Sequence, residues 1–270
     1  MDVLSADWPG ILRRVVAAQE QLFAETPGRA ERTVYEGVGE GGDRTLVIDR
    51  LCEDVVFAEL EQLAAAGASF LAISEERGEV SFGDGGPARV VIDPIDGSLN
   101  ARRTLPSHSL SIAVSSGPSM ADVELGFVHD FGAGEGFLAR RGAGATLDGR
   151  PIHVGEDGAR LEVLGVEAAE PQGLLPVAQN LGGSVYRLRV IGSIAITTAY
   201  VAAGRLDGML SLRPCRSVDI AAAQLIVREA GGSLAFGELD PSEAELGLDA
   251  RYPIAAAAGE LGLGTISTAF

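Results

Sequence analysis

The stretch that decides the fold is Val91-Ile92-Asp93-Pro94-Ile95-Asp96-Gly97-Ser98-Leu99-Asn100, in which an apolar run ends in two aspartates three residues apart. Pro94 stiffens the turn after the run, and Gly97 lets the backbone approach a ligand closely. Two carboxylates held this close repel each other unless a cation lies between them. Ser98 adds a hydroxyl to its amide N–H for binding phosphate oxygens. The stretch therefore predicts a divalent-metal site joined to a phosphate cradle, with an ordinary surface turn as the alternative.

Acidic residues also stand where other expected elements begin or end. Asp49 and Glu53 lie four residues apart in a helix expected over 46–66, Glu75 follows a strand expected over 70–73, and Asp219 opens a helix expected over 219–230. Each acid has an ordinary interpretation too, because most surface acids are only solvated. Asp49 and Asp219 would then be helix-start acids favoured by the macrodipole. Glu53 would be a solvent-facing partner of the neighbouring Arg50.

The order of these segments resembles the inositol monophosphatase family. Its signature, Asp-Pro-Ile/Leu-Asp-Gly-Thr, corresponds to Asp93–Ser98, and the segments around Asp49, Glu75 and Asp219 resemble three further motifs of the family. The segments 191–195, 203–207 and 229–232 also match in order and spacing. The resemblance covers nearly the whole chain. It implies an α+β fold, a layered αβαβα sandwich of the inositol monophosphatase/fructose-1,6-bisphosphatase type.

The resemblance also implies a set of metal ligands. Glu75, Asp93 and the backbone carbonyl of Ile95 would bind one Mg²⁺ ion, and Asp93, Asp96 and Asp219 would bind a second. Such an oxygen-rich set suits magnesium, with Mn²⁺ as an alternative. A third, weaker ion is implied near Glu75, close to the acids of the glycine-rich segment 37–42 and its flank (Glu40, Asp43). That segment also fits Gly-x-Gly-x-x-Gly, but its flanks favour a mobile loop over a dinucleotide site.

Catalytic and substrate-binding roles follow from the same resemblance. Asp49, Glu75 and Ser98 would orient or deprotonate the attacking water. The amides of Gly97 and Ser98 would hold phosphate oxygens, while Asp96 and the backbone of Gly192-Ser193-Ile194 would hold sugar hydroxyls.

A second phosphate would bind Arg213 or Arg216, whose alternative role is charge balance on an acidic surface. The stretch 210–216 lacks the acid that animal-type members carry there. It is more similar to archaeal-type members, which also cleave fructose 1,6-bisphosphate.

Composition excludes several classes of function. The chain has 270 residues, a net charge of −17 and no lysine, so a Walker A phosphate loop is absent and nucleic acid is an unfavourable partner. No apolar run is long enough to span a membrane, no secretory signal is visible at the N-terminus, and the two cysteines, Cys52 and Cys215, fit a reducing compartment. The cytoplasm is the expected location.

The pattern of elements predicts two halves, 1–155 and 156–270. The first would carry the metal and phosphate site on helices over 9–24 and 46–66 and strands over 70–73, 89–92, 110–115 and 123–131, followed by turns over 142–151. The second alternates strand and helix, with strands over 161–166, 185–190, 207–212 and 233–236 and helices over 174–181, 193–203 and 219–230. It would complete the site with Asp219, with helices on both faces of its sheet.

The expected activity is therefore that of a Mg²⁺-dependent phosphomonoesterase. Inositol 1-phosphate is the first candidate substrate and fructose 1,6-bisphosphate the second; 3′-phosphoadenosine 5′-phosphate and histidinol phosphate are rivals on the same scaffold. A haloacid-dehalogenase-type phosphatase needs Asp-x-Asp and a lysine, which this chain lacks. A non-catalytic metal- or sugar-phosphate-binding protein is the remaining alternative. Relatives are commonly homodimers, so a homodimer is expected by analogy.

Overall fold

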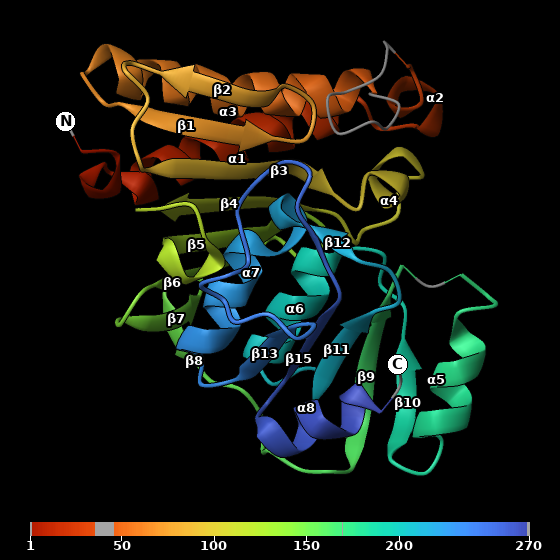
Figure 1. Cartoon of the computed structure of the whole chain (residues 1–270). Helices are drawn as coiled ribbons and strands as arrows, with labels where there is room; N and C mark the ends of the chain where they lie inside the picture. The colour runs from red at the N-terminus through yellow and green to blue at the C-terminus, as the bar shows by residue number, and fades with distance from the viewer. Residues whose placement is uncertain (1, 36–45, 169, 269–270) are drawn as a thin grey trace.

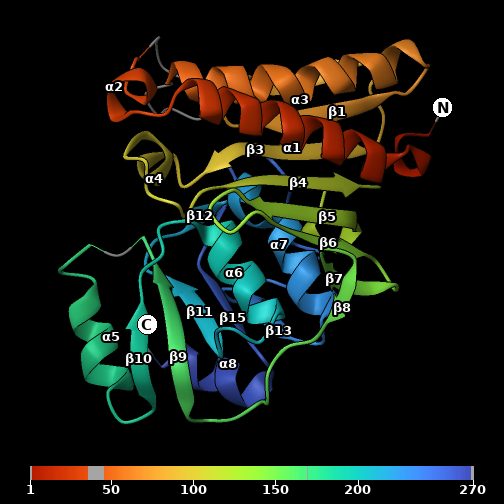
Figure 2. The same ribbon diagram turned by 180° about the vertical axis from the view of Figure 1, so that it is seen from behind.

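The computed structural model describes residues 2–35, 46–168 and 170–268, and these form five stacked layers (Figures 1 and 2). Helices α1 and α3 cover the outer face of a large sheet, α6 and α7 lie between this sheet and a second one, and α5 and α8 cover the far face of the second. This arrangement confirms the expected α+β layered sandwich. Glycine-rich segment 37–42, with Glu40 and Asp43, lies outside the described residues.

The helices are α1 (Trp8–Glu25), α2 (Arg29–Arg32), α3 (Val47–Ala65), α4 (Ser98–Arg102), α5 (Leu174–Leu181), α6 (Ile194–Ala202), α7 (Ser217–Glu229) and α8 (Glu260–Ser267). Strands β1 to β8 are Phe70–Ser74, Gly78–Phe82, Arg89–Asp96, Ser109–Ser115, Val123–Asp130, Glu135–Arg140, Gly144–Leu147 and Arg150–Ile152. Strands β9 to β15 are Leu161–Glu167, Val185–Arg189, Gly208–Ser211, Cys215–Arg216, Ser233–Phe236, Arg251–Tyr252 and Ile254–Ala257.

The large sheet has the strand order β2-β1-β3-β4-β5-β6-β7-β8. Its pairs are antiparallel except for β1 and β3, which run parallel, with Ile73 opposite Val91 and Ser74 opposite Ile92. Continuing this register by one residue places Glu75 beside Asp93. The parallel pair therefore delivers two acids to the same edge of the sheet.

Alternation along these strands decides which way the acids face. Val90 and Ile92 pack in the core under α1 and α3, whereas Ile73 and Val91 pack on the opposite face, against α6 and α7. Because side chains alternate along a strand, an acid two residues beyond either of the latter lies on the middle-layer side. The strand pattern thus directs Glu75 and Asp93 toward the start of α7.

The second sheet has the strand order β10-β9-β11-β15-β13. Its first three strands run parallel, and β15 pairs antiparallel with β11 and β13. Helix α7 packs so closely on the large sheet that a Cβ on Gly126 of β5 would lie 2.4 Å from the carbonyl oxygen of Ala222. This close approach fixes the depth of α7, and with it the position of its first turn.

Most expected elements are present, with some corrections. Asp7 caps α1 through the Gly10 N–H at 3.1 Å, and β4 and β5 form the expected antiparallel pair. The region 142–151, expected to be turns, contains β7 and most of β8. Every strand of the large sheet ends before residue 153 and every strand of the second begins after 160, while the division of the chain near 155 stays a prediction.

Among the described residues no helix is long and apolar enough to cross a membrane.

Candidate active site

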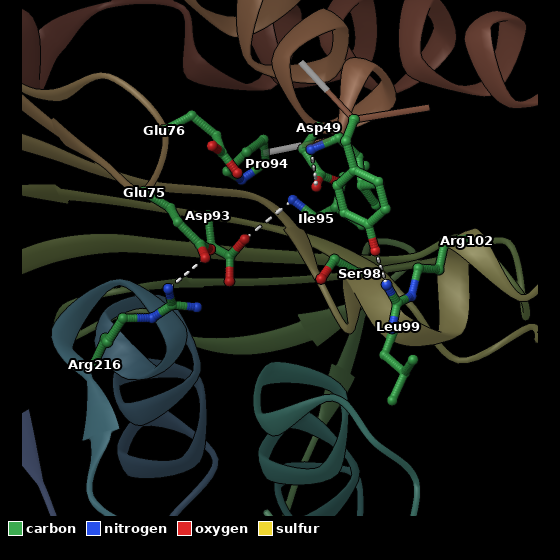
Figure 3. Close-up of a pocket in the computed structure, with 12 residues that line it drawn as sticks. Asp49, Glu75, Glu76, Asp93, Pro94, Ile95, Ser98, Leu99, Arg102 and Arg216 are labelled. Carbon is green, nitrogen blue, oxygen red and sulfur yellow. Dashed lines mark hydrogen bonds and ion pairs between the residues drawn. The ribbon is translucent and has the colours of Figure 1, made fainter. Parts of the chain in front are cut away.

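Three carboxylates from distant parts of the sequence meet at the edge of the large sheet. Glu75 comes from the turn after β1 and Asp93 from β3 (Figure 3), and Asp219 comes from the first turn of α7. One oxygen of each lies within 4.8 Å of the others. These are three of the acids expected to converge, and the parallel β1–β3 register and the depth of α7 bring them together.

A positive charge already lies among these acids. The guanidinium of Arg216, the residue before α7, donates to Glu75 and also to Asp219, the latter through Nε at 3.2 Å. Asp93 uses one oxygen to accept the Ile95 N–H at 3.0 Å, but its other oxygen, Oδ2, is buried without a hydrogen-bond partner. A buried carboxylate oxygen without a partner is costly, and a hard cation would satisfy it. The donor set therefore fits a divalent metal ion.

Burial and mutual repulsion hold protons on these groups in the absence of a metal. Desolvation, opposed by the charge of Arg216, raises the pKa of Glu75 to about 8. Desolvation raises the pKa of Asp49 to about 7 and that of Asp96 to about 7. The pKa of Asp93 is raised well above its usual value by burial and then by the charges of Glu75 and Asp96. The cluster is therefore built to exchange protons for cations.

Asp96 joins the large sheet to the start of α6. Its Oδ2 accepts the hydroxyl of Ser193 at 2.5 Å and the N–H of Ala195 at 2.7 Å. The next residue, Gly97, has φ +87°, and a Cβ there would lie 2.9 Å from the Ser107 carbonyl oxygen and 3.0 Å from that of Gly192. Glycine is thus required for this close approach. The contacts bring the expected phosphate turn and the expected sugar-binding segment 192–194 side by side.

Two side chains outside segment 191–193 fix its backbone. The buried carboxylate of Glu167 accepts the N–H groups of Ile191 and Gly192 at 3.1 and 2.9 Å. The Asn100 amide of α4 donates to the Ile191 carbonyl oxygen at 2.8 Å and to the Ser107 carbonyl oxygen at 2.8 Å. Neither role could be predicted from a local pattern, because both depend on contacts between elements far apart in the chain.

Glu53 is buried, whereas its ordinary interpretation placed it in solvent. It is fully buried and accepts the Ser74 hydroxyl at 2.5 Å and the Arg77 N–H at 3.1 Å, while Arg50 pairs with Asp54 instead. The alternative interpretation of Glu53 as a solvent-facing partner of Arg50 therefore does not hold, because Ser74 and the turn after β1 contact its carboxylate. Glu53 thereby fastens the turn that carries Glu75.

A cavity of about 380 Å³ opens beside the acids. Of the expected site residues it is lined by Asp49, Glu75, Asp93, Ile95, Ser98 and Arg216. Asp49 is 5% exposed and its Oδ1 is buried without a partner. Arg213 lies elsewhere, on the surface, paired with Glu170 at 2.5 Å. The two arginines thus differ: Arg216 reaches the acids and Arg213 does not line this cavity.

No site role was assigned from the sequence to six other residues that line the cavity: Tyr35, Leu46, Glu76, Pro94, Leu99 and Arg102. Arg102 donates to the Tyr35 hydroxyl. A usable signal was present, since Arg102 follows Ser98 by four residues and so shares its face of α4.

Comparison with known proteins agrees with this geometry. The profile of the inositol monophosphatase family matches residues 13–268. Proteins named fructose-1,6-bisphosphatase/inositol-1-monophosphatase are 32% identical in Methanothermobacter thermautotrophicus, over 86% of each chain, and 34% identical in Thermococcus kodakarensis, over 96% of each chain. A crystal structure described as inositol monophosphatase-fructose 1,6 bisphosphatase has a TM-score of 0.85 at 27% identity, covering 98% of this chain and 100% of that one. The resemblance seen in the motifs is confirmed: this chain belongs to the inositol monophosphatase family and is a phosphoric monoester hydrolase.

Proposed function

We propose that this enzyme hydrolyses phosphate monoesters of small sugars and cyclitols, with inositol 1-phosphate as the first candidate and fructose 1,6-bisphosphate as the second. The observation that carries the proposal is the convergence of Glu75, Asp93 and Asp219, two of which, Glu75 and Asp93, line one cavity together with Ser98. The names of the archaeal relatives support this choice of substrates. A phosphate-release assay over sugar and nucleotide phosphates tests it, with 3′-phosphoadenosine 5′-phosphate and histidinol phosphate as the rival substrates. Release only from these rivals would overturn the substrate assignment.

The family is metal-dependent, and the proposed metal is Mg²⁺, with Mn²⁺ as the alternative. Glu75, Asp93 and the Ile95 carbonyl would hold one ion, and Asp93, Asp96 and Asp219 a second. Bound there, the ions would lower the pKa of a water and neutralise charge on the phosphoryl oxygens and the leaving alkoxide. A third site near Glu75 would draw on Glu40 and Asp43, which lie outside the described residues.

The chain's own side chains would place the reacting groups. Asp49 and Ser98 face the cavity from α3 and α4, and they would orient the attacking water together with Glu75. The amides of Gly97 and Ser98 would hold the phosphate. Asp96 and the backbone of segment 192–194 would hold the sugar hydroxyls, which requires the backbone shape that Glu167 and Asn100 impose.

The assembly and setting of the enzyme are part of the same proposal. We propose a homodimer in the cytoplasm that uses neither nucleic acid nor a membrane as a partner. The strongly acidic composition, with a net charge of −17, supports the exclusion of nucleic acid. Light scattering of the purified protein tests the dimer.

Ser98→Ala should lower kcat about 100-fold while KM changes less than twofold, which is the size expected when a group that positions or moves a proton is lost. Steady-state kinetics on inositol 1-phosphate measure both constants. Ser98→Thr restores a hydroxyl and is the matched control, expected to keep most of the activity. A rise in KM with kcat unchanged would show that Ser98 only binds the substrate.

The metal-free protein should lose thermal stability as the pH rises from 5 to 8. Folding raises the pKa of Asp49 to about 7, of Asp96 to about 7 and of Glu75 to about 8, so in this window the folded state holds protons that the unfolded chain has released. Stability therefore falls with rising pH. Because Mg²⁺ replaces these protons, its stabilising effect should be larger at pH 8 than at pH 5. Thermal unfolding with EDTA and with Mg²⁺ measures this, and equal stabilisation at both pH values would contradict it.

A further inference from the structure

A second cationic side chain enters the cavity beside Ser98. Arg102 is the last residue of α4 and follows Ser98 by four residues, so both side chains lie on one face of this short helix. Figure 3 shows the Arg102 guanidinium extending toward Ser98, and both residues line the cavity. A rise of about 6 Å over four helical residues separates the two backbone positions, and the arginine side chain reaches back over part of that distance.

The guanidinium of Arg102 is held in place by a hydrogen bond but has no ion pair with a described carboxylate. Its guanidinium donates to the hydroxyl of Tyr35, a neutral group, and within the residues that the structure describes no carboxylate forms an ion pair with it. The two other candidate arginines are engaged: Arg216 by Glu75 and Asp219, and Arg213 by Glu170. Among these three arginines, Arg102 is therefore the one that faces the cavity without an ion pair to a described carboxylate, although Asp49 lines the same cavity and interacts with its charge.

We propose that Arg102, held by Tyr35, binds a second phosphate of the substrate, one helical turn from the phosphate that is hydrolysed. This assignment rests on the proposed function and names a substrate class within it, the sugar bisphosphates. A guanidinium binds phosphate through paired N–H donors, and the contact is strong in a partly enclosed cavity. Arg102 thus takes the specificity-determining role, binding of a second phosphate, that the sequence analysis assigned to Arg213 or Arg216.

The test compares fructose 1-phosphate with fructose 1,6-bisphosphate at saturating Mg²⁺, measuring kcat and KM for each. In Arg102→Gln, the ratio of kcat/KM for the bisphosphate to that for the monophosphate should fall about tenfold, as expected for one lost charged hydrogen bond. The loss should appear in KM for the bisphosphate. Tyr35→Phe removes the hydroxyl that positions Arg102 and should shift the ratio in the same direction by a smaller factor.

Arg103→Gln is the matched control, because Arg103 is exposed, adjacent and outside the cavity lining, and it should leave both substrates unchanged. An equal loss for both substrates in Arg102→Gln would assign Arg102 to the hydrolysed phosphate and overturn the inference, as would an unchanged ratio. If the unaltered enzyme releases phosphate from neither compound nor from inositol 1-phosphate, the proposed function fails, and calorimetric titration of both fructose phosphates decides the inference. Tighter binding of the bisphosphate that Arg102→Gln abolishes supports it; equal binding overturns it.

Discussion

Asp93→Asn is expected to abolish turnover while leaving the fold intact. Asp93 lies at the centre of the acidic cluster, with one oxygen bonded to the Ile95 N–H and the other buried without a partner. An amide oxygen continues to accept the Ile95 N–H, but the amide nitrogen cannot bind a cation. With the bridging ligand lost from both proposed ions, kcat should fall at least about 1,000-fold, which corresponds to about 4 kcal/mol of transition-state stabilisation.

The thermal stability of the metal-free Asp93→Asn variant, unlike its activity, should not decrease. The pKa of Asp93 is raised well above its usual value by burial and by neighbouring acids, so the ionised group opposes folding at pH 8. Without metal, Asp93→Asn should therefore unfold at the same temperature as the unaltered protein or at a higher one. Asp148→Asn is the control, since Asp148 lies in the turn between β7 and β8, outside the cavity lining. Unchanged kcat in Asp93→Asn would refute the bridging role.

Removing the metal should reduce phosphate release to below about 1% of the original rate, because an essential Lewis acid contributes several kcal/mol to the transition state. Three carboxylate oxygens lie within 4.8 Å of one another, and an incoming phosphate adds negative charge to them. In the described cluster only Arg216 contacts these acids with a positive charge. The positive charge of one guanidinium is not enough both to bind a phosphate there and to activate a water molecule.

Excess EDTA followed by added Mg²⁺ tests this directly in a phosphate-release assay. The rate should vanish with EDTA and return with Mg²⁺. EDTA already saturated with Mg²⁺ is the control, because it contains the same chelator but removes no metal from the enzyme. Full activity in excess free EDTA would eliminate the metal mechanism and, with it, the proposed roles of the acids.

The fold and the acidic centre were largely predictable from the sequence. An apolar run that ends in Asp93 and Asp96 is a local pattern, and the ordered family motifs extend it to Asp49, Glu75 and Asp219. Local patterns also predicted α5 with its observed bounds. What makes these acids meet, the parallel register of β1 and β3 and the depth of α7, is a property of the sheet and not of any one segment.

Other features were beyond prediction for identifiable reasons. Helix α8 contains Gly262 and Gly264, which are poor helix formers, and tertiary packing overrides this: a Cβ on Gly262 would lie 3.1 Å from that of Ala257. The burial of Glu53 depends on contacts with Ser74 and Arg77, which lie 21 and 24 residues further along the chain. Arg213 and Arg216 look alike in sequence, and only their acidic neighbours separate them.

The way Glu167 and Asn100 hold segment 191–193 has a consequence for mutational tolerance. Both bind main-chain atoms, one the N–H groups and the other the carbonyl oxygens. The backbone shape of segment 191–193 is therefore determined by residues outside the segment. The sensitive positions of a mutational scan should include Glu167 in β9 and Asn100 in α4, although neither side chain is proposed to touch the substrate.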